Sequence, residues 1–231
     1  MSTPATPGRP GRKVPTVRRS AILASAAVVL LAIPASAVAG GLFPPRPGTT
    51  VTLLPAGQDN PSIADGVAIG KGTALYKSSG LGPAALNPAA PAGSEARYID
   101  TEVFPGGVLP PGVTITEAQG INVLRRIGEN LARAGLTYQD VISMRVFLQN
   151  PDGQERMDFN GWNRAYRQFF ANTSLSTGKP VLVPLGSAAL APPMVVNPAR
   201  PSRFAIEIEN LPVNGWLVEV EVDAAYSAKK K

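Results

Sequence analysis

Two segments near the end of the chain alternate between apolar and polar residues. In residues 204–209 phenylalanine and isoleucine take every second position, and in residues 218–223 three valines alternate with Glu219, Glu221 and Asp223. A period of two is typical of half-buried strands. The connection at residues 211–215 ends in Asn-Gly, which supplies the positive φ angles of a tight turn. The pattern therefore predicts two strands paired as an antiparallel hairpin.

Arg203 stands at the start of the first of these strands, and acidic side chains line one face of the second. Two interpretations are open. A guanidinium across from carboxylates can clamp the carboxylate of a substrate while a glutamate positions water. The same residues also fit a solvated strand face with a surface ion pair, and the pattern alone favours this second interpretation.

A period of 3.6 residues indicates two helices. Residues 114–117 fit a capping box, and apolar residues recur at helical spacing as far as Leu131, before Gly135 ends the first helix. The second helix is predicted from about residue 157 to 171. Its apolar stripe is aromatic, and we expect these side chains to pack in the core: Phe159, Trp162, Tyr166, Phe169 and Phe170. Asn163 is the polar residue within this stripe.

Further strands are predicted at residues 50–54, 67–69, 73–79 and 142–148, and Gly70-Lys71-Gly72 is predicted to form the turn between the second and third of them. The resulting order of strands and helices is typical of an α+β domain, in which two helices pack on one face of a mixed β-sheet.

Two segments, residues 81–113 and 172–200, are rich in proline and lack periodicity, so we expect them to be insertions; only 97–104 within them resembles a strand. The predicted domain spans residues 61–227. An extended lead-in at 38–60 precedes it, and a basic tail at 228–231 follows it.

The first 37 residues resemble a secretory signal peptide. A basic, proline-rich start is followed by an apolar run at 21–33 and by Ala35-Ser36-Ala37, which predicts cleavage after Ala37. We therefore expect a periplasmic or secreted protein without a stable membrane span after cleavage. Arg18-Arg19 leaves open whether export follows the general or the twin-arginine route. A retained membrane anchor is the alternative, although the apolar run is short for it.

Composition narrows the chemistry. The chain has no cysteine and no histidine, which excludes disulfides, thiolate nucleophiles, Cys/His zinc sites and an imidazole base. The net charge is +6, but residues 1–37 hold five basic and no acidic side chains, which leaves 17 basic and 16 acidic side chains elsewhere. A net charge of +1 and the lack of a basic stripe with interleaved aromatics argue against a nucleic-acid partner.

Several of these motifs, taken in order, resemble the RidA/YjgF family of enamine/imine deaminases. The C-terminal part of the resemblance is Pro201-x-Arg203, an alternating strand, Leu211-Pro212, a short turn and Val-Glu-Val-Glu. Upstream it includes Thr-Glu-Ala-Gln at 116–119, the aromatic helix around Asn163, and Ser79-Gly80. The family's fold is RidA/chorismate-mutase-like, and its members are homotrimers with clefts at the subunit interfaces.

The resemblance implies hydrolysis of imines such as 2-iminobutanoate to 2-oxo acids and ammonia, without a metal or other cofactor. It implies that Arg203 binds the substrate carboxylate and that Glu219 holds the attacking water, assisted by the backbone of Ala205. Ser79 and Gly80 would line the cleft, where Asn163 also matches a family asparagine.

Three features depart from the family pattern. Ile63 stands where many active members carry a tyrosine that closes the cleft, two insertions flank the site segments, and the chain carries an export signal. A second hypothesis is therefore a trimeric, non-catalytic protein that binds small carboxylates through Arg203. The label of endoribonuclease or translation inhibitor, which some family members carry, is a weaker alternative because the charge after residue 37 is almost neutral.

Overall fold

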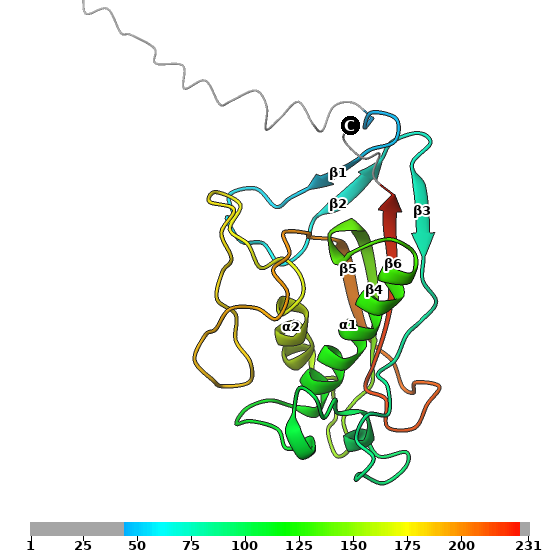
Figure 1. Cartoon of the computed structure of the whole chain (residues 1–231), viewed down its shortest axis with the longest axis vertical. Helices are drawn as coiled ribbons and strands as arrows, with labels where there is room; N and C mark the ends of the chain where they lie inside the picture. Colours follow the sequence, from blue (N-terminus) through cyan, green and yellow to red (C-terminus); the bar gives the residue numbers. More distant parts are fainter. Residues whose placement is uncertain (1–43, 227–231) are drawn as a thin grey trace, which may run out of the picture. The chain divides into compact units, whose positions relative to one another are not determined.

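The protein was analysed as a computed structural model, which describes residues 44–226. The predicted signal peptide, the first part of the lead-in and the basic tail lie outside the described residues. The regular elements, apart from short 3₁₀ turns, follow in this order (Figure 1): β1 Thr50–Leu53, β2 Gly66–Ile69, β3 Ala74–Lys77, α1 Ile115–Arg133, β4 Val141–Leu148, α2 Phe159–Arg167, β5 Ser202–Glu207 and β6 Val218–Tyr226.

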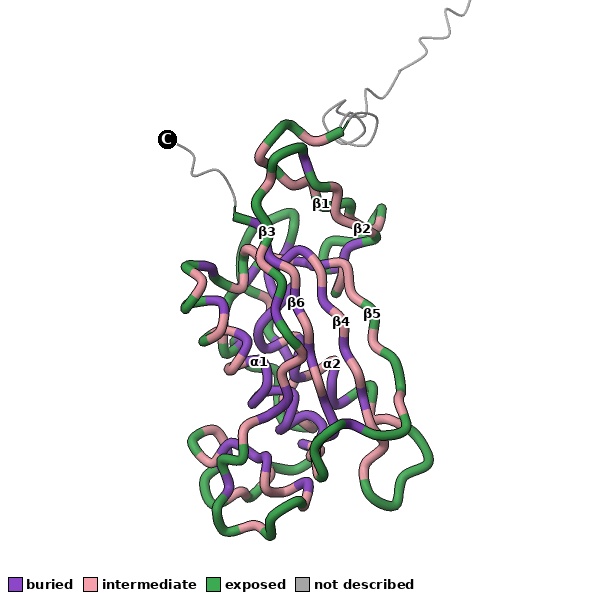
Figure 2. Tube along the Cα trace, turned by 90° about the vertical axis from the view of Figure 1, so that its right-hand side faces the viewer, coloured by how far each residue is buried: buried purple, intermediate pink, exposed green. Residues whose placement is uncertain are grey.

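The central sheet has four strands in the order β3-β6-β4-β5. β6 runs antiparallel to both β3 and β4, whereas β5 runs parallel to β4, so the sheet is mixed as predicted. Figure 2 shows α1 and α2 behind the same face of this sheet. The predicted α+β architecture is therefore confirmed, and the face turned away from the helices is left open in one chain.

The predicted hairpin of the last two strands is wrong. β5 and β6 both pair with β4, which lies between them. β4 is an eight-residue strand with one fully buried face, and its two edges pair with β6 and with β5. Gly215 does adopt the positive φ expected of it, 85°, but it turns a longer connection from β5 across the end of β4 to β6.

Two other strand predictions need correction. β2 and β3 both form, but β2 pairs with β1 in a separate two-stranded sheet, and β3 pairs with β6. The segment 97–104 is not a strand, since Glu95–Tyr98 forms a 3₁₀ helix and turns follow it. Pairing partners were decided by the packing of distant segments, which local alternation does not encode.

The core lies between the sheet and the two helices. Met144, Val146 and Leu148 of β4 are completely buried there, as are alternate valines of β6. The predicted aromatic stripe is buried at Trp162, Tyr166, Phe169 and Phe170, but Phe159 is 41% exposed because it begins the helix. Regular α-helix ends at Arg167, earlier than predicted. No helix within residues 44–226 is long and apolar enough to cross a membrane.

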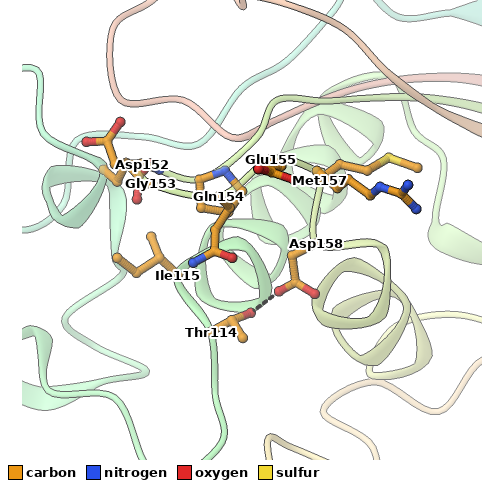
Figure 3. A pocket seen from close by; sticks show the side chains of 11 residues that line it. Thr114, Ile115, Asp152, Gly153, Gln154, Glu155, Met157 and Asp158 are labelled. Carbon is orange, nitrogen blue, oxygen red and sulfur yellow. Dashed lines mark hydrogen bonds between the residues drawn. The ribbon is translucent and has the colours of Figure 1, made fainter.

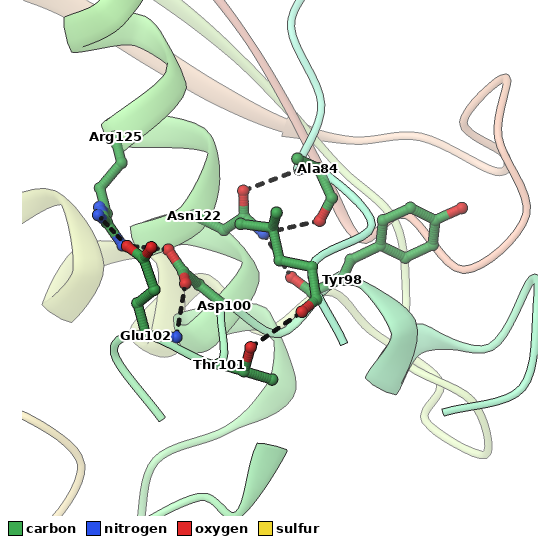
Figure 4. Close-up of polar contacts among 8 residues, drawn as sticks. Ala84, Tyr98, Asp100, Thr101, Glu102, Asn122 and Arg125 are labelled. Carbon is green, nitrogen blue, oxygen red and sulfur yellow. Dashed lines mark hydrogen bonds and ion pairs between the residues drawn. The ribbon is translucent and has the colours of Figure 1, made fainter. Parts of the chain in front are cut away.

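Buried polar side chains of α1 anchor the first insertion, residues 81–113. Asn122 donates to the carbonyl oxygens of Ala84 and Tyr98 at 2.9 and 2.8 Å, and its own oxygen accepts from the Ala84 N–H at 2.9 Å (Figure 4). Arg125 forms ion pairs with Asp100 and Glu102 of the same insertion. The insertion is therefore attached to the helix layer at defined points.

The second insertion, residues 172–200, is attached in the same manner. Thr114 caps α1 by accepting from the Glu117 N–H at 3.1 Å, but the Glu117 carboxylate does not complete the predicted capping box. It accepts from Arg164 at 2.8 Å and from the Gly186 N–H of the insertion at 3.0 Å. Burial is the main cause of the raised pKa of Glu117. The insertion is thus held by a buried carboxylate in place of apolar packing alone.

Candidate functional site

Arg203 and Asn163, both predicted as site residues, are in direct contact. Arg203 is the second residue of β5, and its Nη2 donates to Asn163 Oδ1 of α2 at 2.6 Å. The guanidinium carbon lies 4.2 Å from the centre of the Tyr166 ring, within the range of a cation–π interaction. A helix, a strand and an aromatic face therefore hold this guanidinium in one orientation.

The other terminal nitrogen of Arg203 is unusual. Nη1 is buried and has no hydrogen-bond partner among residues 44–226. Burial lowers the pKa of Arg203, partly offset by Tyr166. The group nevertheless stays charged at working pH, because a guanidinium deprotonates only in strong base. A buried donor without an acceptor is costly, so this nitrogen is suited to bind an anionic oxygen.

A cavity of about 430 Å³ opens at the start of β5. Ile63, Asp65, Ser143 and Arg203 are among its lining residues. The segment that carries Ile63 is joined to the strand by the Ala64 N–H, which donates to the Pro201 carbonyl at 3.3 Å. The position at which the family resemblance implies a tyrosine thus lies beside Arg203, and an aliphatic side chain occupies it here.

Glu219 and Gly80 form a second group, on β6 and on the chain that follows β3. Leu81 and Val220 exchange two backbone hydrogen bonds of 2.9 Å, which places Gly80 directly over the Glu219 carboxylate. A Cβ at position 80 would meet Glu219 Oε1, so any other residue there would displace the Glu219 carboxylate from its present position. Burial and, to a smaller extent, Glu221 raise the pKa of Glu219. A carboxylate with a raised pKa is a better proton acceptor than an ordinary glutamate.

Ser79 is exposed, and its side chain makes no hydrogen bond within the described residues. The neighbouring Ser78 is buried and its hydroxyl accepts from the Val222 N–H at 2.9 Å, so it anchors β3 to β6. Ser79 therefore remains next to Gly80 and Glu219 with a free hydroxyl. Ala205 lies two residues after Arg203, on the helix-facing side of the edge strand β5.

The two groups lie on opposite faces of the sheet. Arg203 pairs with Met144, whose side chain is buried under the helices, whereas Glu219 pairs with Phe147 on the open face. From strand spacing and rise, their Cα atoms lie about 14 Å apart. The interpretation that Arg203 stands across a hairpin from the carboxylates is therefore wrong within one chain. The candidate residues thus form two separate groups, one around Arg203 and one around Glu219, which we call candidate half-sites.

Two features of the site were missed or underestimated from sequence. Tyr166 was predicted only as core, but its ring also carries the Arg203 guanidinium, and its hydroxyl donates to the Ser62 carbonyl at 2.9 Å. Its spacing of three residues from Asn163 is the signal that places both on one helix face. Arg145 of β4 was not singled out, yet it binds Glu221 and Asp223 beside Glu219 at 2.7 Å each.

A larger cavity, of about 950 Å³, contains none of the predicted site residues. It is lined by residues 151–158 together with Glu95, Thr114 and Ile115 (Figure 3). Asp158 accepts from Thr114 Oγ1 at 2.5 Å and from the Gly161 N–H at 2.8 Å. Asp158 is thus engaged in capping α2, and Glu95 accepts from the Asp152 N–H at 2.6 Å. No cluster of three or more potential metal ligands occurs in the described part of the chain.

Comparisons with known proteins give a family. Residues 106–226, more than half of the chain, match the family model described as Endoribonuclease L-PSP. No curated protein matches the chain. Solved structures similar to it include a member of the YjgF/YER057c/UK114 family from Mycobacterium tuberculosis, with 19% identity and a TM-score of 0.36 over 77% of this chain and 100% of that one.

Two further solved structures are similar at the same level. A Rid-family protein of unknown function from Yersinia pestis is 16% identical, with a TM-score of 0.41 over 77% of this chain and 98% of that one. Escherichia coli TdcF with bound serine is 20% identical, with a TM-score of 0.37 over 66% and 81% of the two chains. On the match of the family model to more than half of its length, this chain belongs to the Endoribonuclease L-PSP family, that is, the RidA/YjgF proteins.

Proposed function

We propose that this protein is an exported deaminase that hydrolyses reactive enamines and imines of 2-amino acids to 2-oxo acids and ammonia. The observation that carries the proposal is the Arg203 guanidinium, which is stacked on Tyr166 and bonded to Asn163 while Nη1 has no acceptor within residues 44–226. A guanidinium held in this manner binds a planar carboxylate with little loss of side-chain entropy.

The chemistry needs only a positioned water and a proton relay. A protonated imine carbon is electrophilic, so water adds to it when a carboxylate accepts the water proton. In the proposed cycle Glu219 takes that proton and returns it to the amine nitrogen of the tetrahedral adduct. Glu219 then takes the proton of the adduct hydroxyl as the carbon–oxygen double bond forms and the carbon–nitrogen bond breaks. Ammonia leaves and takes up this proton, and the 2-oxo acid remains on Arg203.

The proposal includes assembly of several copies, because Arg203 and Glu219 lie on opposite faces of one sheet. The open face carries Phe204 and Ile206, which are 47% and 43% exposed, and β5 is an edge strand. A second copy that covers this face would bring its own Arg203 or Glu219 to the partner half-site. We propose the homotrimer of the family, with three sites between neighbouring copies.

The test is hydrolysis of 2-iminobutanoate generated in the cuvette. We expect the wild-type protein to accelerate it, and Arg203→Ala to lower kcat/KM by at least about 100-fold, since charge-assisted hydrogen bonds to the carboxylate are lost. Arg203→Lys should not restore the rate, because an ammonium lacks the planar fork. Glu219→Ala should reduce kcat more than it changes KM.

Glu209→Gln, a change at an exposed residue outside both half-sites, serves as the control. Absence of acceleration by a folded, assembled protein would overturn the enzymatic proposal. It would then favour the second candidate, a binder of small carboxylates, which the aliphatic Ile63 beside Arg203 already supports. A binder is stabilised thermally by 2-oxo acids in an Arg203-dependent manner but leaves the imine unchanged.

A further inference from the structure

A second arginine next to the proposed site shares the unusual state of Arg203. Arg167 is the last residue of α2, four residues after Asn163 and therefore on the same stripe of the helix. Its Nη1 is also buried and has no hydrogen-bond partner within residues 44–226. Burial and the nearby Arg200 lower the pKa of Arg167. Arg203 contacts Asn163, and Arg167 lies one helical turn further along α2, so two guanidinium groups on either side of Asn163 each have a buried donor without a partner in residues 44–226.

Arg200 shows what a purely structural arginine looks like in the same region. It is only 4% exposed, and its guanidinium donates to four oxygens, which belong to Pro61, Pro198, Thr173 and Asn60. These bonds tie the second insertion to the segment before β2. Its contacts are complete, so Arg200 contributes positive charge but no free donor. Arg167 and Arg203 differ from it because each has a buried Nη1 without a hydrogen-bond partner in residues 44–226, and a ligand can bind there.

Positive charge in this region is not paired with carboxylates at salt-bridge distance, although Asp65 lines the same cavity as Arg203. Arg203 lies over the Tyr166 ring and Arg167 directly follows Tyr166 in α2. Burial raises the pKa of the Tyr166 hydroxyl, and all three guanidinium groups partly offset this rise. No acidic side chain of the described part of the chain forms a salt bridge with Arg167, Arg200 or Arg203. Asp59 interacts with Arg200 over a longer distance, and its oxygen is already bonded to the Ser176 N–H at 2.7 Å.

The end of α2 does not account for this arrangement. A cation at a helix C-terminus gains only a small stabilisation from the helix dipole. Desolvation of an ion costs several kcal/mol even after the protein relaxes. The dipole is therefore too weak to explain two partly buried guanidinium groups with unpaired donors, whereas an anionic ligand would satisfy both.

We propose that Arg167 and Arg203 bind the two ends of a substrate with two carboxylates. This inference rests on the proposed function. Arg203 holds the carboxylate next to the imine carbon, and Arg167 holds the carboxylate of the substrate side chain. Side chains four residues apart on a helix are separated by about 6 Å at Cβ, so Asn163 and Arg167 mark out neighbouring binding positions. The substrate class is the imines of acidic amino acids, and water hydrolyses them to a 2-oxo diacid and ammonia.

The first experiment compares imines formed by an amino-acid oxidase from glutamate and from 2-aminobutanoate, with the full-length protein. We expect kcat/KM to be at least about tenfold higher for the glutamate imine, which corresponds to about 1.4 kcal/mol. Arg167→Gln should lower this ratio at least about tenfold. Arg133→Gln, a change at an exposed arginine near the end of α1, is the matched control and should leave the ratio unchanged. Equal rates with both imines, or an equal fall on both in Arg167→Gln, would overturn the inference.

A binding measurement separates this inference from the proposed function. Calorimetric titration with 2-oxoglutarate, 2-oxobutanoate and inorganic phosphate should give the tightest binding for 2-oxoglutarate, and Arg167→Gln should remove that preference. This result would support the two-carboxylate site even if no imine were hydrolysed. Equal affinity for both oxo acids, or equally tight binding of phosphate, would overturn it. If Arg167→Gln fails to fold, the test compares the preference for 2-oxoglutarate of the wild-type protein with that of Arg167→Lys. Lysine keeps the charge but lacks the planar fork.

Discussion

The two faces of the central sheet differ in burial and in the kind of side chain they carry. Toward the helices, Met144, Val146 and Leu148 are fully buried, and the only cation on this side of β5 is Arg203 at the strand start. On the open face, Arg145 binds Glu221 and Asp223, and Phe147 packs edge-on against Phe204 with 6.4 Å between ring centres. One face is a finished core, and the other is a polar and aromatic surface.

The strands β5 and β6 place their large apolar side chains on opposite faces of the sheet. In β6 the valines face the helices and the acidic residues face outward, as the alternation suggests. In β5 Phe204 and Ile206 face outward, while Arg203 and Ala205 face the helices. An identical two-residue period therefore puts the predicted arginine and glutamate on different faces, which is why we propose that a complete site combines residues of more than one copy of the chain.

The largest expected effect is complementation between two inactive variants. Arg203→Ala and Glu219→Ala should each be almost inactive, but a mixture unfolded and refolded together should recover activity. With random assembly of equal amounts into a cyclic trimer, about a quarter of the interfaces carry both intact residues. Imine hydrolysis by the mixture checks this. If the mixture stays inactive although mixed oligomers form, both residues act from the same chain.

A difference in stability should follow the two faces. Leu148→Ala, in the core, should lower the free energy of unfolding by about 3 kcal/mol, because it leaves a cavity under the helices. Phe147→Ala, at the adjacent position on the open face, should cost only about 1 kcal/mol in the isolated chain. Urea unfolding followed by circular dichroism measures both. Sedimentation should in addition show weaker assembly of Phe147→Ala, and equal losses of stability would contradict the contrast.

The ion pairs of the open face predict a dependence of stability on acid. Arg145 lowers the pKa of Asp223 below its ordinary 3.8, so the folded state binds protons less readily than the unfolded state. The stabilisation is therefore complete above pH 3.8 and is lost as the pH falls through the lowered pKa. Asp223→Asn should cost about 2 kcal/mol at neutral pH and flatten the curve at low pH. An unchanged acid limb in thermal unfolding would argue against this role.

The smallest effect concerns Glu221, whose charge helps to raise the pKa of Glu219. If Glu219 must be ionised to accept a proton, activity falls at acid pH as it becomes protonated. Glu221→Gln should move that fall to lower pH, because a neighbouring negative charge has been removed. The pH profile of kcat/KM measures the shift, with Glu209→Gln as the control. An unchanged pH profile in Glu221→Gln would show that protonation of Glu219 does not cause the fall in activity at acid pH.

Much of the fold follows from local patterns. The capping Thr114 and Gly135 bracket a helix that runs from Ile115 to Arg133, and the strand at 142–148 differs from β4 by one residue. Of the candidate site, the contact between Arg203 and Asn163 and the approach of Gly80 to Glu219 agree with the residues chosen from sequence. The family match supports the choice of motifs but leaves the roles of these residues as proposals.

Residue spacing sufficed where the interactions are local, as in helix caps, strand periods and the aromatic stripe of α2. Strand order could not be predicted in that manner, because β5 and β6 pair with the two edges of β4 and not with one another. The face to which Arg203 points, the free donors of Arg167 and the anchoring of both insertions depend on contacts between residues far apart in the chain. Such contacts are set by packing of the whole core, which a short window of sequence does not contain.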